Sequence, residues 1–506
     1  MIETTIWEWL RELRAALRRS AWWPALEVEG IDGLDALLVP LYQGALVQVR
    51  DGGADALGSP RPSLARGMAA AARLLRGQPP ETWRRLRAAV NSSPPRPASV
   101  AFWPRQINHV MVQEPVAVAL ATRGVENLFL TAHPGPFEAA RRQGQTITWA
   151  PRAWSRRLQE AAGRAARGDA VLRRDPGVPL PTLPEIGSGN VDWLRQTLRS
   201  HLPAVHAAAD TTEALFETIR PRILVVGNDL TLEGRTAALV AQRHGVITAC
   251  LMHGLVRREP LHSAHIADRF LLYGERSCRQ LLDLGAVPET LVVCGCPKMD
   301  PPPRQQHRLD PRLRRLGVTP GQPWVLVATS GPGHSVSLGH HERIVSAIAR
   351  LSRKRREVRF VVKLHPKDPI ACYRPHSGET PWVVAEHGRR DLPREIFDWL
   401  QGCHAVITGA STVAVEAMLL EVPVITVDLE EELTAVDFIR EGATLHANDE
   451  AELEGALDAA LECPAAALDT LERARRFAAE TFHQPPGGAT AKVATTLLEL
   501  LMGEGG

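Results

Sequence analysis

The chain has few cysteines and no strong excess of charge of either sign. Its seven cysteines are scattered, at positions 250, 278, 294, 296, 372, 403 and 463, and no Cys-x-x-Cys pair occurs. This spacing excludes a disulfide framework and a zinc-finger signature, so we expect reduced thiols in a cytoplasmic protein. Lys and Arg number 59 against 57 Asp and Glu. Such a balance argues against a protein that mainly coats nucleic acid, and we expect no nucleic-acid partner.

Long apolar segments are also missing. No apolar run reaches the length of about 18 residues that spans a bilayer, and Glu, Trp and Arg throughout the first turns exclude a signal peptide. Residues 1–25 nevertheless contain a basic, Trp-bearing helix, whose apolar residues Ile6, Leu10, Leu13 and Leu17 recur on one face. Such a helix can lie on the inner membrane face as a peripheral contact or pack on its own protein. We favour packing.

The 506 residues are enough for two or three domains. Pro-rich linkers at 91–99 and 301–312 divide the chain. After the first linker, short apolar strands alternate with helices, which predicts parallel sheets covered by helices on both faces. The predicted fold class is therefore α/β with two doubly wound, Rossmann-like domains. The expected parts are a Trp-rich extension (1–95), a first domain (96–302) with a helical insertion (151–219), and a second domain (303–506) that ends in helices.

The strands are predicted from short apolar runs bounded by polar or Gly residues. In the first domain they lie at 99–104, 126–133, 222–229, 246–253, 268–274 and 290–295. In the second domain they lie at 324–330, 358–366, 381–387, 404–410 and 422–428.

Polar residues follow the ends of six of these strands. Because open parallel sheets bind ligands at the carboxyl ends of their strands, these residues form the candidate site. In the first domain the set comprises Asp229, Glu233, His253, Gly254, Lys298 and Asp300. In the second domain it comprises Ser330, Gly331, Gly333, His334, Lys363, His365, Ser411, Thr412 and Glu416.

The chemistry of this set favours phosphate binding. Ser411 and Thr412 open a predicted helix, whose N-terminal N–H groups and dipole attract an anion. Gly331 and Gly333 allow a backbone loop to approach a phosphate closely. The sequence has no G-x-x-x-x-G-K-[ST] motif and no H-E-x-x-H or H-x-H cluster. A P-loop ATPase is thus excluded, and we expect neither a metal nor another cofactor, with helix dipoles, His and Lys neutralising the phosphates.

Several segments resemble one superfamily. The block "GVITACLMHGLV…ADRFLLYG…VVCGCPKMD" resembles a segment of bacterial surface- and capsule-polysaccharide transferases and of CDP-glycerol glycerophosphotransferases. "FVVKLHPKD" resembles their His-Pro motif, and "VITGASTVAVEAMLLEVPVIT" resembles their donor-site helix. The chain is thus similar to GT-B glycosyltransferases over residues 220–495. The resemblance implies two facing Rossmann-like domains that move a sugar or polyol phosphate from a nucleotide-activated donor to a polysaccharide or lipid-linked glycan.

The resemblance also assigns roles to single residues. It implies that His365 contacts the donor phosphate, that Ser411 and Thr412 hold the phosphates, and that Glu416 lies one turn deeper. His253 would face the acceptor and remove its hydroxyl proton, because an imidazole titrates near neutral pH. The predicted reaction is metal-independent sugar transfer.

Three alternatives stay open. Glu233 is a rival for the role of base. A UDP-sugar 2-epimerase shares the two-domain fold, and Asp229, Glu233 and Asp300 would supply the carboxylates that it needs around the sugar. The chain would otherwise be a non-catalytic, nucleotide- or sugar-binding scaffold of a polysaccharide assembly complex, docked through residues 1–95.

Overall fold

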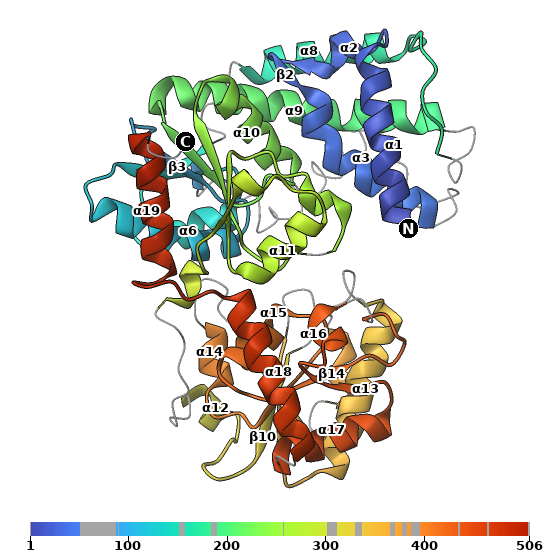
Figure 1. Cartoon of the computed structure of the whole chain (residues 1–506), viewed down its shortest axis with the longest axis vertical. Coiled ribbons are helices and arrows are strands. Elements are labelled where there is room, and N and C mark those ends of the chain that lie inside the picture. The colour runs from blue at the N-terminus through green and yellow to red at the C-terminus, as the bar shows by residue number, and fades with distance from the viewer. Residues whose placement is uncertain are drawn as a thin grey trace, which may run out of the picture. The chain divides into compact units, whose positions relative to one another are not determined.

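The chain forms two compact units in a computed structural model. The structure describes residues 2–50, 85, 88–89, 91–150, 157–183, 190–256, 258–300, 311–328, 336–364, 370–376, 382–385, 395–433, 436–462 and 465–503. Unit 1 comprises Met1–Leu272, Ser277–Pro297 and Thr490–Gly506, and unit 2 comprises Tyr273–Arg276 and Lys298–Ala489. Each unit has its own large parallel sheet with helices packed around it (Figure 1). The predicted doubly wound α/β fold class is confirmed.

The sheet of unit 1 has seven strands in the order β5-β4-β3-β6-β7-β8-β9, and all neighbours pair in parallel. The chain runs outward from β3 on one side and from β6 on the other, so the sheet has a topological switch point between these two strands. The strands are β3 (Val100–Trp103), β4 (Asn127–Thr131), β5 (Ile147–Trp149), β6 (Ile223–Val226), β7 (Ile247–Leu251), β8 (Arg269–Leu272) and β9 (Leu291–Val293). All six strands predicted for this domain are present, and β5 is an addition.

The helices of this sheet include the last helix of the chain. They are α6 (Ile107–Ala121), α7 (Pro134–Arg142), α10 (Leu232–Arg243), α11 (Glu275–Asp283) and α19 (Ala489–Met502). In α19, Thr496 contacts Cys294 at 3.9 Å, and the carbonyl of Leu501 accepts a hydrogen bond from Arg222. The expected boundary at 303–506 is therefore wrong for α19. The sequence pattern gives the helix but not the sheet on which it packs.

The N-terminal extension and the helical insertion pack together as one helical layer of unit 1 (Figure 1). Trp9 of the extension lies 6.1 Å from Trp193 of the insertion, measured between ring centroids. Their shared apolar core makes two parts that are distant in the sequence into a single structure. Its elements are α1 (Ile2–Arg18), α2 (Trp23–Leu26), β1 (Glu27–Val28), β2 (Ile31–Asp32), α3 (Gly33–Arg50), α8 (Arg157–Leu172) and α9 (Asn190–Ile219).

The apolar face of α1 is used for this packing. Ile6, Leu10, Leu13 and Leu17 are each at most 3% exposed, and burial of such side chains stabilises a fold by roughly 1.5–3 kcal/mol each. Packing, the interpretation favoured for this helix, is confirmed, and its apolar stripe is not open to a membrane surface. None of the described helices is long and apolar enough to cross a membrane.

Arg235 joins the helical layer to the sheet. Its buried guanidinium donates to the carbonyls of Asp35 in α3 (2.6 Å) and Ala264 (2.5 Å). The carboxylate of Asp35 lies 3.8 Å away. A buried cation needs such partners, so α3 is fixed against the start of α10.

The sheet of unit 2 has six parallel strands in the order β12-β11-β10-β13-β14-β15. This order repeats the pattern of unit 1, with a switch point between β10 and β13. The strands are β10 (Trp324–Ala328), β11 (Arg359–Lys363), β12 (Trp382–Ala385), β13 (Ala405–Thr408), β14 (Val424–Val427) and β15 (Leu445–Ala447), of which the last was not predicted. The helices are α12 (Pro311–Arg315), α13 (Leu338–Lys354), α14 (Glu395–Leu400), α15 (Thr412–Leu419), α16 (Asp437–Arg440), α17 (Glu450–Glu462) and α18 (Ala465–Thr481).

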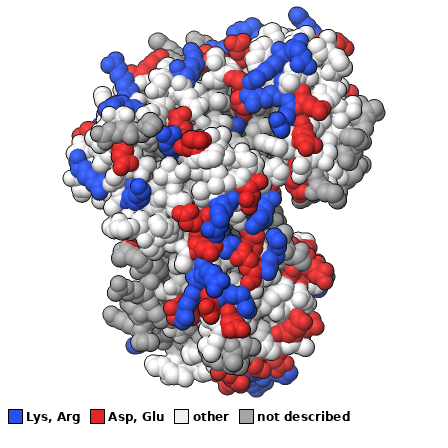
Figure 2. All heavy atoms as spheres, viewed as in Figure 1, with Lys and Arg blue, Asp and Glu red and all other residues white. Residues whose placement is uncertain are grey.

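Acidic and basic side chains are intermingled on the face drawn in Figure 2. Ion pairs between exposed side chains of unit 2 include Arg350 with Glu450 (2.5 Å) and Arg475 with Glu421 (2.9 Å). Exposed pairs of this kind contribute about 0–1 kcal/mol each. The two charges of each such pair neutralise each other locally.

Candidate active site

Unit 1 contains a cavity of about 740 Å³ at the carboxyl ends of β3, β4, β5 and β6. Trp103 ends β3, Ala132 and His133 follow β4, Trp149 ends β5, and the segment Leu230–Glu233 leads from β6 into α10. The cavity thus lies at the switch point of the sheet, where open α/β sheets bind their ligands. Its size falls within the range of small-molecule sites.

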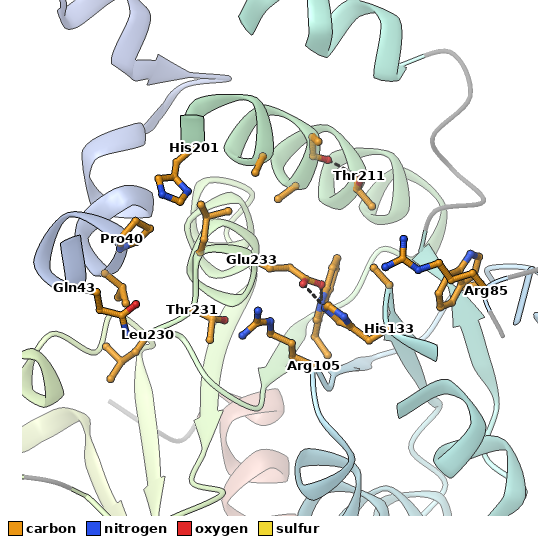
Figure 3. A pocket seen from close by; sticks show the side chains of 18 residues that line it. Pro40, Gln43, Arg85, Arg105, His133, His201, Thr211, Leu230, Thr231 and Glu233 are labelled. Carbon is orange, nitrogen blue, oxygen red and sulfur yellow. Dashed lines mark hydrogen bonds and ion pairs between the residues drawn. The ribbon is translucent and has the colours of Figure 1, made fainter. Parts of the chain in front are cut away.

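Helices of the extension and the insertion cover the opposite side of the cavity. Pro40 and Gln43 come from α3, and His201 and Thr211 come from α9 (Figure 3). Between the last two, α9 presents alanines to the cavity at positions 204, 207 and 208, which leaves space above the strand ends. The extension of the chain is therefore part of the cavity wall.

The turn between β6 and α10 places Glu233 in the first turn of that helix. Thr231 caps α10 by accepting a hydrogen bond from the backbone N–H of Gly234 at 3.2 Å. A Cβ atom at position 234 would lie 2.1 Å from the carbonyl oxygen of Asn228. Only glycine permits this tight turn. The positive end of the helix dipole also favours a carboxylate at position 233.

Glu233 forms a hydrogen-bonded pair with His133. Its Oε2 lies 2.6 Å from the Nε2 of His133, and its Oε1 accepts a hydrogen bond from the indole N–H of Trp103 at 2.9 Å (Figure 3). Burial alone would raise the pKa of Glu233, but His133 and Trp103 lower it more, with a further contribution from the charge of Arg105. The pKa of this carboxyl is therefore below its ordinary value. A carboxylate and an imidazole in this contact can pass a proton to and from a bound molecule.

His253, the base predicted from the sequence, does not line the cavity. Its ring lies 4.2 Å from that of His109, which is fully buried, and it hydrogen-bonds to the backbone of Gly227. Burial lowers the pKa of His253 to about 4, so the imidazole is neutral at neutral pH. Beside it, Gly254 faces open space.

Asp229 also lies outside the cavity wall. It is fully buried, forms an ion pair with His265, and accepts hydrogen bonds from the backbone N–H groups of Ile266 (2.8 Å) and Ala267 (3.1 Å). Burial would raise the pKa of Asp229, but His265, Arg235 and the N–H group of Ile266 lower it well below the ordinary value. All of its oxygen atoms are thus engaged in holding the segment that follows β7.

Unit 2 brings two predicted residues into direct contact. The Nζ of Lys298 lies 2.6 Å from the Oε1 of Glu416, whose side chain is only 4% exposed. Asp300 lies against Gly488, where an added Cβ would meet its Oδ2 at 3.0 Å. Lys298 and Asp300 therefore belong to unit 2 and not to the first domain, where the sequence placed them.

The predicted phosphate loops are only partly described. Ser411 caps α15 by accepting the N–H of Val413 at 3.3 Å, and Thr412 is exposed in the first turn. Lys363 ends β11. The remaining predicted residues, Ser330, Gly331, Gly333, His334 and His365, lie outside the described residues.

Two groups of described residues have the donor atoms for a metal ion. The first is Asp229 with Cys250 and His265, and the second is His340 with Glu430 and Glu432. In the first group the carboxylate is already occupied by the contacts given above. In the second, His340 Nε2 accepts the backbone N–H of Leu429 at 2.9 Å. Both groups thus have hydrogen-bonding roles in the fold.

Sequence reasoning missed the most informative members of the cavity. Trp103, Arg105 and His133 were not singled out, although they stand at the ends of the predicted strands 99–104 and 126–133. The same strand-end rule that selected Glu233 would have found them.

No protein-family model and no curated protein sequence matches the chain. Among solved structures, a candidate UDP-N-acetylglucosamine 2-epimerase from Listeria monocytogenes has a TM-score of 0.52 and 15% identity, over 80% of this chain and 96% of that one. Another UDP-N-acetylglucosamine 2-epimerase has a TM-score of 0.50 and 15% identity, over 81% and 97%. MnaA from S. aureus, solved with UDP, has a TM-score of 0.51 and 13% identity, over 80% and 97%.

These neighbours agree with the GT-B resemblance at the level of the fold. They correct the predicted function, because two of these three structures are described as 2-epimerases and none is described as a glycosyltransferase. The 2-epimerase alternative therefore has better support than the predicted glycosyltransferase. The narrower resemblance to capsule transferases and CDP-glycerol enzymes receives no support.

Proposed function

We propose that the chain is an enzyme that acts on a nucleotide sugar as a 2-epimerase, with the cavity of unit 1 as its sugar site. The observation that carries the proposal is the Glu233–His133 pair, held at 2.6 Å in the wall of a cavity at the switch point. The fold shared with 2-epimerases gives additional support. Of the carboxylates considered for this reaction, Glu233 is the one that lines the cavity.

The pair suits the chemistry of such a reaction. Inversion at C2 of a nucleotide sugar requires that a proton leaves one face of C2 while the C1–O bond to the nucleoside diphosphate breaks, so that the C2–H electron pair forms a C1=C2 double bond. The diphosphate oxygen then adds back to C1 as a proton is delivered to the other face of C2. Glu233 is ionised at neutral pH because its pKa is lowered, so it can accept a proton. His133 can hold and return one through Nε2. A positioned acid or base contributes about 10²–10⁴-fold to such a step.

For the phosphates of a nucleotide sugar, the sequence predicts ligands in unit 2. Ser411 and Thr412 at the N-terminus of α15 remain the candidate ligands for its phosphates. We expect the reaction to need no metal, since helix N–H groups and basic side chains would neutralise the phosphates. Because epimerisation needs no acceptor, one substrate alone is sufficient for the test.

The test is incubation of the full chain with UDP-N-acetylglucosamine alone in D₂O, followed by proton NMR. We expect loss of the C2 proton signal and appearance of the 2-epimer. Glu233→Gln should reduce the rate by about 10²-fold or more. Glu213→Gln is the matched control. Glu213 forms a similar pair with His244, with 2.5 Å between Oε2 and Nε2, and neither residue lines the cavity. Absence of exchange with this and other UDP-sugars would refute the proposal.

A further inference from the structure

Trp103 contacts the oxygen of Glu233 that His133 does not contact. Its indole N–H donates to Oε1 at 2.9 Å, whereas Nε2 of His133 lies 2.6 Å from Oε2. The side chain of Glu233 is only 20% exposed, so these two contacts make up much of its polar surroundings. The two oxygens of this carboxylate therefore have different partners.

The backbone of the sheet fixes the position of Trp103. It is the last residue of β3, it pairs with Val226 of β6, and its carbonyl accepts the backbone N–H of Gly227 at 3.3 Å. The segment that begins at Gly227 leads into α10, which carries Glu233. The indole itself is enclosed by protein, since Trp103 is 3% exposed. Residues on strands position a site more precisely than residues on loops, so the donor is in place before a substrate binds.

The two partners of Glu233 differ in what they can do with a proton. An indole N–H only donates, whereas an imidazole nitrogen donates or accepts according to its protonation. A proton on Oε2 is therefore shared with His133. A proton on Oε1 finds no acceptor in the indole, and it weakens the bond from Trp103, because a hydrogen bond to an ionised oxygen is the stronger kind. Protonation of Glu233 is thus directed to Oε2.

We infer that Trp103 is a positioning residue, whose indole N–H holds Oε1 of Glu233 and so leaves Oε2 as the oxygen that takes the proton from the substrate. The inference rests on the proposed function and deepens it by naming the reacting oxygen. The proton that leaves C2 of the sugar arrives on Oε2, where it can pass to Nε2 of His133. Oε1 keeps its bond to the indole throughout, so the carboxylate does not change its orientation between the two proton transfers.

The test compares Trp103→Phe with Trp149→Phe in the full chain, since phenylalanine lacks the indole N–H but keeps an aromatic ring. Trp149 is the matched control. It also ends a strand, lines the same cavity and is 4% exposed, but its indole makes no hydrogen bond to Glu233.

The first measurement is exchange of the C2 proton of UDP-N-acetylglucosamine as a function of pH. We expect Trp103→Phe to lower kcat about tenfold or more, because a hydrogen bond to a charged group is lost. The acid limb of kcat/KM should move to higher pH, because burial then raises the pKa of Glu233 against one favourable partner fewer. Trp149→Phe should leave the acid limb at its wild-type pH.

The second measurement needs no turnover. Carbon-13 NMR of the chain labelled at its glutamate carboxyl groups, with Glu233→Gln to assign the signal, follows the titration of Glu233 directly. We expect the pKa of Glu233 to be higher in Trp103→Phe than in the wild type and in Trp149→Phe.

The outcomes separate the inference from the proposed function. An acid limb and a Glu233 titration that are both unchanged in Trp103→Phe overturn the inference, while exchange by the wild type still supports the function. If the wild type exchanges no proton with any UDP-sugar, the function fails, and the carboxyl titration alone decides whether Trp103 holds Glu233. If Trp103→Phe unfolds the chain, NMR of the indole N–H groups replaces it. The indole signal that shifts in Glu233→Gln should titrate with Glu233 in the wild type, and the absence of such a signal overturns the inference.

Discussion

Glu233 and His133 lie 100 positions apart in the sequence, yet their side chains meet at 2.6 Å. The contact follows from the strand order, since β4 and β6 flank β3 on its two sides and all three strands end at the same edge of the sheet. His133 follows β4 and Glu233 begins the helix after β6. The pair is therefore a product of the doubly wound topology, and it forms only when the central strands are correctly ordered.

The pair should determine the acid limb of the pH–rate profile. His133 and Trp103 outweigh burial and lower the pKa of Glu233, so the base stays ionised until the pH falls below the ordinary range of a glutamate. We expect kcat/KM for a UDP-sugar to decline only below that range. His133→Gln should move the acid limb to higher pH, because the largest favourable partner of the carboxylate is lost. If the acid limb stays at the same pH in His133→Gln, Glu233 is not the titrating base. The control Glu213→Gln should leave the pH–rate profile unchanged.

The half-buried His253 should make the chain less stable in acid. Its pKa falls from 6.5 to about 4 in the folded chain, so the unfolded chain binds the proton first as the pH drops. Stability is lost between pH 6.5 and about 4, by up to about 3 kcal/mol from this residue. Urea unfolding at pH 7 and pH 4.5 measures the loss. His253→Gln should flatten the pH dependence, whereas His244→Gln, whose imidazole is 39% exposed, should not. The same slope in wild type and His253→Gln would contradict this.

The strands were predictable because most of them consist largely of apolar residues, as at Ile223–Val226. The missed strands of the two large sheets, β5 and β15, have only three residues each, and the missed β1 and β2 have two each. Strand β9 is as short as β5, but it was predicted within the longer run 290–295. Helix α1 shows both sides of this limit. Its apolar stripe predicts that one face is buried. The residue that Trp9 of this helix contacts, Trp193, lies far along the chain, and no local sequence pattern predicts that contact.

The candidate site was predictable in the same partial way. The strand-end rule selects Glu233, which lines the cavity, and equally selects Asp229 and His253, which do not. Their different positions depend on which neighbours enclose them, namely His265 around Asp229 and His109 around His253. Burial of a polar side chain by a residue from another element has no signature in the local sequence.

Lys298 and Glu416 should be coupled in stability. The carboxylate of Glu416 is 4% exposed and lies 2.6 Å from the ammonium of Lys298. Removing one partner of a buried pair leaves an uncompensated charge, which costs about 3–5 kcal/mol. We therefore expect Lys298→Ala to lower the unfolding free energy of the chain by about 3 kcal/mol. Lys354→Ala is the matched control, because its side chain is 65% exposed against Glu454, and it should cost less than about 1 kcal/mol. If both variants lost the same unfolding free energy, the Lys298–Glu416 pair would stabilise the chain no more than an exposed pair does.

Two glycines near His109 and His253 should respond differently to the same substitution. At Gly227 an added Cβ would lie 2.0 Å from the Nδ1 of His109, whereas at Gly254 it would meet no atom within 4 Å. His109 is fully buried, so its ring cannot turn out into solvent without opening the packing around it. Gly227→Ala should therefore destabilise the chain by about 1–3 kcal/mol or more through overpacking, and Gly254→Ala should change stability by less than about 0.5 kcal/mol. Thermal unfolding of both variants measures the difference. A tolerated Gly227→Ala would mean that the His109–His253 contact can open, and the low pKa of His253 would then have to rise with it.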